Sequence, residues 1–213
     1  MSIEPRRLAG ALMFVGAAQF LVGMLLAEAL YPGYSISGNY ISDLGAYCNG
    51  VFPNAGVCVI YQPTSNIFNT SVFLLGVLLV IAAYFLRRPN RMKAFSVLVL
   101  LTGIGAMGVA IFPETNPIAH EITSDIAFLF AGLSAIWGYR LAKPPMSYFS
   151  VILGVVNLVA IVLFTANVLF GLGVGGMERM IVYPVVVWAI GIGGYFMNSE
   201  MGTGPAPPKP AMQ

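Results

Sequence analysis

Six long apolar blocks, separated by short polar segments, constrain this chain more than any other feature of its sequence. At 1.5 Å per residue, a helix of about twenty residues crosses the ~30 Å hydrocarbon layer of a membrane. The blocks predict membrane spans at residues 8–30, 67–86, 94–112, 122–141, 148–170 and 180–197. We expect each span to be a helix, because a backbone exposed to lipid must satisfy its own hydrogen bonds.

The composition excludes a soluble domain and a nucleic-acid-binding protein. Hydrophobic residues make up 58% of the 213 residues and charged residues only 8%, whereas about a quarter of a typical soluble domain is charged. The formal net charge of +2 is too small to favour nucleic acid as a partner. The sequence therefore predicts an all-α polytopic membrane protein, with residues 1–198 as one six-helix domain and 199–213 as a disordered, Pro-rich cytoplasmic tail.

The basic residues predict how the chain is oriented in the cell membrane. With six spans, every Lys and Arg except Arg179 falls on one side. Short loops rich in Lys and Arg mark the cytoplasmic face, so we expect both termini in the cytoplasm. The long segment between the first two spans, about residues 31–66, is then extracytoplasmic.

This long segment carries the only two cysteines of the chain, Cys48 and Cys58. Loops of this length without regular structure are usually functional or disordered, and its aromatic residues and cysteines favour an ordered cap. Because the exterior is oxidising, we predict a disulfide between the two thiols. Without a nearby histidine they make a poor zinc site, and a redox-active pair is more usually spaced C-x-x-C.

Ionisable residues gather at the extracytoplasmic ends of several predicted helices. They are Glu28, Asp43, Glu114, His120, Glu121, Asp125, Glu178 and Arg179. Some of them are explained as caps, because acidic side chains are favourable at helix N-termini. Asp125 lies inside a predicted helix, where a carboxylate normally points inward at a partner. Arg179 opens the last predicted helix against the positive-inside pattern, so we expect an acidic partner for it, with Asp43 and Glu114 as the candidates.

Several motifs follow one another from the first span to the last. They are SGNYISDLG, then Phe68, Asn69, Ser71 and Gly76, then GIGAMGVAIFPE, a lone histidine, FLFAG and GMER. This series resembles a bacterial and archaeal membrane family known only as domain of unknown function 998. A weaker similarity links the ISD-G loop and the histidine to the Frag/DRAM/Sfk membrane proteins, some of which are associated with lipid remodelling. The resemblance implies membrane lipids as partners but no reaction, and the cysteine pair is not part of its pattern.

The polar positions covered by the resemblance form a candidate site. Asp43 would orient the imidazole of His120 for proton transfer, with Ser42 or Ser124 as a hydroxyl nucleophile, although no G-x-S-x-G elbow is present. A divalent metal held by His120 and carboxylates is an alternative, without a recognised ligand spacing. The surrounding polar cluster comprises Asn39, Asn69, Glu114, Asp125, Glu178 and Arg179. We expect four groups to converge beneath the long loop beside a lipid-accessible cleft: Asp43, Glu114, His120 and Arg179.

Other classes of membrane protein are disfavoured by what the spans contain. A b-type haem needs paired axial ligands, and the single histidine cannot supply them. The polar residues near the midplane, Gln19 and Asn157, are expected to hydrogen-bond neighbouring helices rather than form a transport site.

Two function hypotheses from different classes fit the sequence. The first is an enzyme that acts on a lipid in the outer leaflet, as a lipid-modifying hydrolase or transferase. The second is a non-catalytic lipid-binding or membrane-organising protein whose polar cluster is structural. The sequence does not separate them, because both require polar groups above an apolar cleft.

Overall fold

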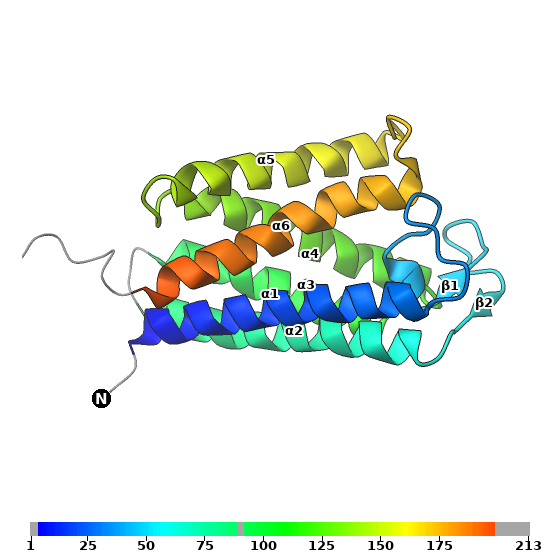
Figure 1. Cartoon of the computed structure of the whole chain (residues 1–213), viewed down its shortest axis with the longest axis horizontal. Coiled ribbons are helices and arrows are strands. Elements are labelled where there is room, and N and C mark those ends of the chain that lie inside the picture. Colours follow the sequence, from blue (N-terminus) through cyan, green and yellow to red (C-terminus); the bar gives the residue numbers. More distant parts are fainter. Residues whose placement is uncertain (1–3, 89–91, 199–213) are drawn as a thin grey trace, which may run out of the picture.

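The computed structural model describes residues 4–88 and 92–198, and the expected tail at 199–213 lies outside this part of the chain. Its helices are α1 (Pro5–Leu30), α2 (Thr64–Leu86), α3 (Lys93–Ile111), α4 (Pro117–Gly138), α5 (Met146–Thr165) and α6 (Gly173–Met197). Each helix packs against the next in the chain, and α6 returns to α1, so that the bundle closes on itself (Figure 1). Because α6 also contacts α4 directly, α5 lies at the periphery against these two helices.

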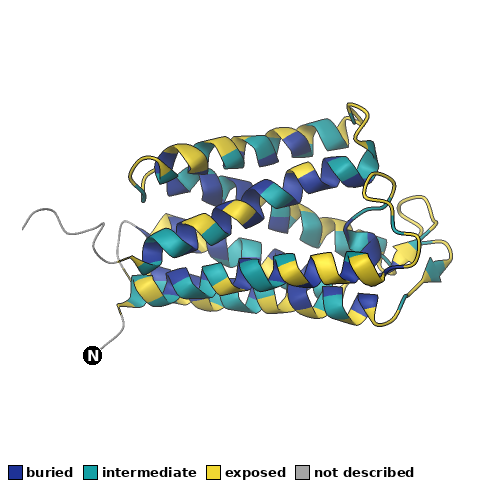
Figure 2. Ribbon diagram, in the orientation of Figure 1, coloured by how far each residue is buried: buried dark blue, intermediate teal, exposed yellow. Residues whose placement is uncertain are grey.

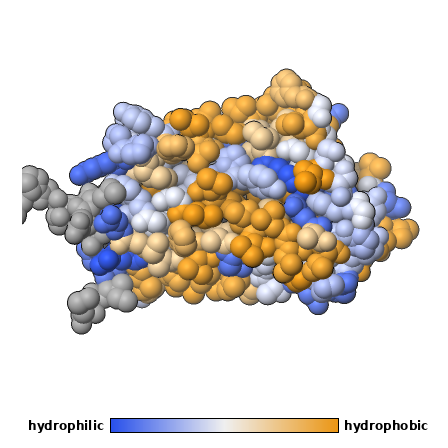
Figure 3. All heavy atoms as spheres, viewed as in Figure 1, coloured by the Kyte–Doolittle hydropathy of each residue, from blue (hydrophilic) through white to orange (hydrophobic). Residues whose placement is uncertain are grey.

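Helix length and composition are those of a membrane protein. Five of the helices are long and apolar enough to cross a membrane, which leaves only α4. α4 has 22 residues and packs against α3, α5 and α6 in the same bundle. On the face shown in Figure 3, apolar residues form a band around the middle and hydrophilic residues gather at both ends. The prediction of an all-α polytopic fold with six long helices is confirmed.

The last helix begins earlier than its hydropathy predicts. α6 starts at Gly173 rather than at residue 180, and Glu178 and Arg179 consequently lie within the helix, buried, instead of opening it. The glycine-rich start of this helix has low hydropathy, although its backbone takes up the helical conformation. A hydropathy pattern therefore predicts too short a helix at this end.

The fourth helix also begins earlier than predicted, for a reason that is visible in its capping residues. α4 starts at Pro117 rather than at residue 122. Asn116 is its N-cap, and the Asn116 side chain accepts a hydrogen bond from the Ala119 backbone N–H. Asn at the cap followed by Pro at the first position is a favourable start. His120 therefore belongs to the first turn of a helix and not to a turn between helices.

The fifth helix ends earlier than its apolar pattern, which predicted a span to residue 170. α5 stops at Thr165. Asn167 and Phe170 adopt positive φ angles of 57° and 48°. This left-handed conformation cannot continue a right-handed helix, and it turns the chain toward α6.

Polar residues join the helices within the bundle. The Gln19 side chain donates a hydrogen bond from α1 to the Ser71 carbonyl oxygen of α2 at 2.9 Å. The Asn157 side chain does the same from α5 to the Ile181 carbonyl oxygen of α6 at 2.8 Å. Both predictions of interhelical hydrogen bonding are confirmed. Buried residues face the interior of the bundle, whereas exposed residues lie on its outer surface (Figure 2).

Residues 31–63 connect α1 to α2 and cover one end of the bundle; we call this segment the cap and that end the cap end. The cap contains a 3-10 helix, Ser42–Leu44, and two short antiparallel strands, β1 (Tyr47–Cys48) and β2 (Cys58–Val59). The predicted disulfide joins Cys48 to Cys58 and is confirmed. Ile41, Leu44 and Ala46 are all buried, so the cap is packed onto the helices. It ends at residue 63, slightly before the predicted boundary, because Thr64 already begins α2.

Candidate functional site

Arg179, in the second turn of α6, ties the cap to two helices. Its guanidinium forms an ion pair with Glu28 near the end of α1, at 2.5 Å. It also donates hydrogen bonds to the Tyr34 hydroxyl at 2.7 Å and to the carbonyl oxygens of Ile36 at 3.0 Å and Gly175 at 2.9 Å. A guanidinium keeps its charge when buried, and this set of acceptors supports it.

The acidic partner expected for Arg179 is therefore present, but it is Glu28 and not Asp43 or Glu114. α1 and α6 are neighbours in the closed bundle, and this proximity brings the end of one helix to the beginning of the other. Burial also raises the pKa of Tyr34, so its hydroxyl stays protonated beside the ion pair and donates to the Tyr40 carbonyl oxygen at 2.9 Å.

Glu178, the residue before Arg179, holds the cap by a second contact. Its carboxylate accepts a hydrogen bond from the Ile41 backbone N–H. The side chain is 7% exposed. Two adjacent residues of α6 thus bind the backbone of the cap at two positions. Arg179 binds it at Ile36 and Glu178 at Ile41.

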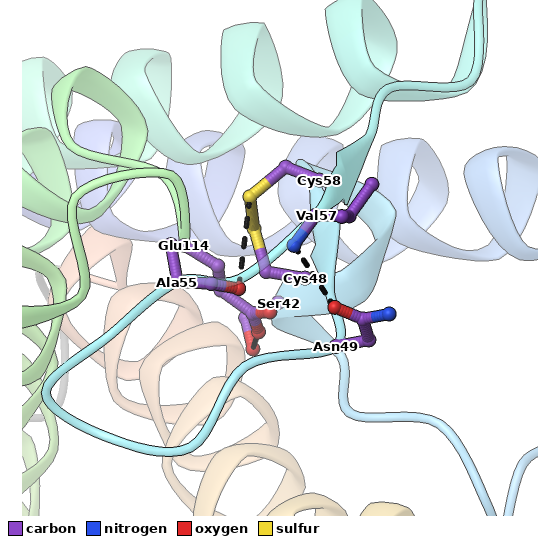
Figure 4. Close-up of a disulfide and its surroundings, with 7 residues drawn as sticks. All are labelled: Ser42, Cys48, Asn49, Ala55, Val57, Cys58 and Glu114. Atoms are coloured by element: carbon purple, nitrogen blue, oxygen red, sulfur yellow. Dashed lines mark hydrogen bonds between the residues drawn. A yellow bond between two sulfur atoms is a disulfide. The ribbon is translucent and has the colours of Figure 1, made fainter.

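Two carboxyl groups interact at the cap end, Asp43 in the cap and Glu114 in the connection between α3 and α4. The Ser42 hydroxyl donates to Glu114 Oε1 at 2.5 Å, and Figure 4 shows both side chains beside the disulfide. Asp43 accepts hydrogen bonds from Asn39 Nδ2 at 2.8 Å and from the Tyr40 N–H at 3.0 Å. Burial, aided by the charge of Asp43, raises the pKa of Glu114 to about 7. Burial likewise raises the pKa of Asp43, although its two donors partly oppose this shift.

His120 is oriented by the backbone rather than by Asp43. Its Nδ1 lies 2.9 Å from the Phe112 carbonyl oxygen, which places the proton of the neutral ring on Nδ1 and leaves Nε2 as an acceptor. Within the described residues no hydrogen bond joins His120 to Asp43. Ser124 follows one turn later on the same face of α4, and its hydroxyl has no partner among the described groups.

A large cavity with polar and apolar groups in its wall lies beneath the cap. Its volume is about 400 Å³, and its wall combines cap residues with residues of α4, α5 and α6. Glu121, Asp125 and Thr165 belong to this wall and are exposed, so the cavity opens between the ends of α4 and α5. Asp125 therefore faces a cavity, where it makes no hydrogen bond or ion pair within the described part of the chain.

A smaller, apolar cavity of about 120 Å³ lies beside the larger one and reaches into the bundle. The residues that line both cavities are Ser42, His120, Ser124, Phe128 and Glu178. From this junction the smaller cavity extends between aliphatic and aromatic side chains to Ser134 and Trp188. The fourteen residues from His120 to Ser134 correspond to roughly 21 Å along α4.

The structure thus separates the predicted site residues into two groups. Six of them line a cavity: Ser42, Glu114, His120, Ser124, Asp125 and Glu178. The other four form hydrogen bonds within the cap or between the cap and the helices: Asn39, Asp43, Asn69 and Arg179. The expected convergence of His120 and Arg179 is not found as a direct contact. Among the residues that the structure describes, no three His, Cys, Asp or Glu side chains are placed to hold a metal ion.

Some residues that matter at this site are not evident from the sequence motifs. Glu28 lies at the end of an apolar span, and Tyr34 is one of several tyrosines in the cap. Ser134, 1% exposed, has a hydroxyl without a hydrogen-bond partner in the wall of the smaller cavity. A signal for Glu28 existed, because it is an acidic residue in an apolar span on the same side of the membrane as Arg179.

The part of the chain that contains these residues matches a known protein family. The family model described as protein of unknown function, DUF998, matches residues 14–194. The chain belongs to the DUF998 family. The matched region of this DUF998 protein includes all residues that line the larger cavity, and the resemblance in the sequence motifs is confirmed. No curated protein and no solved structure matches the chain significantly.

Proposed function

We propose that this DUF998 protein binds a membrane lipid, with the polar group of the lipid in the larger cavity and an acyl chain in the smaller one. The observation that carries the proposal is the common wall of the two cavities, where Ser42, His120 and Glu178 lie between a polar space and an apolar one. A molecule that fills both spaces must be polar at one end and apolar at the other.

The physical chemistry of the two cavities supports an amphiphile rather than a polar metabolite. The smaller cavity is lined by side chains such as Phe20, Phe68 and Val72, which cannot hydrogen-bond a polar ligand. Each methylene transferred into such a space contributes about 0.8 kcal/mol. The larger cavity opens between α4 and α5, at the level where a polar group would enter from a membrane surface.

The separation of Arg179 from Asp43 favours this proposal over a purely structural cluster. A scaffold would be expected to bring the two charges into direct contact and leave no space. Instead, Arg179 binds Glu28, Asp43 binds cap donors, and a cavity of about 400 Å³ remains beneath the cap.

A lipid-modifying enzyme is the second candidate, and His120 is the observation that favours it. Its Nδ1 is fixed by the Phe112 carbonyl oxygen, so Nε2 is available to accept a proton at the junction of the cavities. Ser42 and Ser124 line the same junction. Purified protein incubated with its co-purified lipids tests this function, because a His120→Ala variant should keep its bound lipid and lose any turnover that mass spectrometry detects.

Fluorescence of Trp188 tests lipid entry directly. Trp188 is 3% exposed and lines the smaller cavity, and a Trp137→Phe substitution leaves it as the only tryptophan. A lipid with a nitroxide on its acyl chain should quench Trp188 in this background. The Val185→Phe substitution places a larger side chain in the wall of the smaller cavity. It leaves less room for the acyl chain and should therefore reduce the quenching.

The matched control is Val187→Phe, because Val187 lies on the same helix with 54% of its surface exposed. Quenching in this variant should equal that of the parent. Equal quenching in the Val185→Phe variant would mean that the lipid reaches only the outer surface, and the proposal would fail.

A further inference from the structure

We infer that the larger cavity selects amphiphiles whose polar group carries a positively charged ammonium. The inference rests on the proposed lipid binding and identifies the chemical class of the ligand. It follows from the carboxylates and aromatic rings that surround one space, and from the position of a buried acid that has no cationic partner.

The charged residues of the larger cavity are acidic. Its carboxylates come from the α3–α4 connection, α4 and α6: Glu114, Glu121, Asp125 and Glu178. No Lys or Arg is among the described residues that line it. Arg179, which follows Glu178 in α6, is already paired with Glu28 and is not among the residues that line the cavity.

Glu178 is the deepest of these acids. It is 7% exposed, lines both cavities, and has one hydrogen bond, from the Ile41 N–H. Across the described ranges it makes no ion pair. Burial disfavours the charged form of this carboxyl group when no counter-ion is present, and a ligand ammonium at the junction of the cavities would favour that form.

Aromatic rings provide independent support, because they too favour a cation. Tyr40, Phe52, Phe128 and Phe164 line the larger cavity. The rings of Tyr40 and Phe164 meet edge to face, with centroids 6.1 Å apart. The negative faces of such rings attract alkylammonium groups, and rings combined with carboxylates are a recurring site for them.

The same lining disfavours two other ligands. A metal ion requires converging oxygen or nitrogen ligands, and the described residues contain no group of three that is placed to hold one. A phosphate group prefers Arg or Lys as partners, which the described wall lacks, and it would meet the carboxylate of Glu178 at the junction. An organic cation without a phosphate fits both constraints.

The test compares three amphiphiles that share one nitroxide-labelled chain and differ in the polar group: trimethylammonium, phosphate or hydroxyl. Each is titrated into the Trp137→Phe protein in neutral maltoside micelles, and quenching of Trp188 is recorded. The ammonium compound should reach half-quenching at about a tenfold lower concentration than the hydroxyl compound. The phosphate compound should require the highest concentration.

Neutralising the rim of the cavity provides the matched comparison. Glu121 and Asp125 are exposed wall residues without a hydrogen bond within the described chain. The double variant Glu121→Gln, Asp125→Asn should therefore fold and should reduce the preference for ammonium over hydroxyl severalfold. Glu4→Gln, which neutralises an exposed acid at the N-cap of α1 at the opposite end of the bundle, should leave that preference unchanged.

The outcomes separate the inference from the proposed function. If all three compounds quench equally in the parent, lipid binding stands and the ammonium inference is overturned. If none quenches, the proposed function fails as well. Repeating the comparison with two-chain lipids that bear trimethylammonium without phosphate identifies the source: preference only in the single-chain series supports a free long-chain amine, whereas preference in the two-chain series supports a membrane lipid.

Discussion

At the scale of single residues, two neighbouring side chains of α6 have different roles. Arg179 is held by Glu28 and by the cap and keeps the cap on the bundle. Glu178 binds the cap from one side and faces the cavities on the other. The first residue is expected to determine stability, and the second to affect ligand binding as well.

Glu28→Gln should destabilise the protein markedly. The substitution leaves the buried guanidinium of Arg179 without its counter-ion, and breaking a buried pair from one side typically costs about 3–5 kcal/mol. Chemical denaturation in detergent measures the change in the free energy of unfolding. Glu4→Gln, on the exposed surface, serves as the control and should change it little. Equal stability of the two variants would contradict the structural role of the pair.

Glu114 should make the stability depend on pH. Burial raises its pKa from the usual 4.5 to about 7, so the folded protein binds this proton more tightly than the unfolded chain does. The free energy of unfolding should therefore fall as the pH rises from about 4.5 to about 7, and this contribution should level off above that range.

Thermal unfolding in detergent at a series of pH values measures this effect. Glu114→Gln retains an oxygen that can accept the hydrogen bond from Ser42, and it should flatten the part of the curve that Glu114 produces. An unchanged slope in this variant would show that Glu114 titrates at its ordinary pKa. The raised pKa of Asp43 acts with the same sign and remains in the variant.

At the scale of elements, the hairpin of the cap is cross-linked and also forms part of the wall of the larger cavity. Its strands are joined by the disulfide, and its turn contributes Gly50, Phe52 and Asn54 to the larger cavity. Cys48 of β1 and Glu114 also line this cavity. The integrity of the hairpin is therefore coupled to the shape of the cavity.

Replacing Cys48 and Cys58 by serine should destabilise the protein by about 2–3 kcal/mol, the value expected for a cross-link that closes a loop of this size. Quenching of Trp188 by a nitroxide lipid should weaken as well, because the wall of the larger cavity loosens. A reducing agent should lower the thermal midpoint of the parent and not that of the double variant. A parent that is insensitive to reduction would contradict the prediction.

At the scale of the whole molecule, the bundle closes into a ring because α6 packs on α1. This closure creates an interior space, and the cap covers one end of it (Figure 1). Among the described residues, every Lys and Arg except Arg179 lies in the loops or helix ends at the opposite end of the bundle, which predicts that this end faces the cytoplasm.

Thiol labelling should confirm this orientation. Thr115 and Lys143 are exposed residues in the connections before and after α4, so Thr115→Cys and Lys143→Cys place a single reactive thiol at opposite ends of the bundle. The native cysteines are bridged and should not react. In intact cells, an impermeant maleimide should label the Thr115→Cys variant alone. Labelling of both variants would contradict six spans, and labelling of Lys143→Cys alone would reverse the orientation.

The sequence alone predicts the number of helices and the disulfide. It also predicts that the polar groups gather at one end of the bundle. Hydropathy is a property of each segment by itself, and a membrane requires a long apolar helix wherever it is crossed. Helix ends are less evident, because caps such as Asn116 and the glycine-rich start of α6 carry no hydropathy signal.

Only the tertiary structure decided which polar groups meet. Arg179 pairs with Glu28, 151 residues earlier in the chain, because α6 closes on α1 at the cap end. The side chains of Ser42, His120 and Ser124 line both cavities. Asp43, in contrast, accepts hydrogen bonds from Asn39 and Tyr40. These choices depend on how separate segments pack, and a pattern within any one segment does not contain that information.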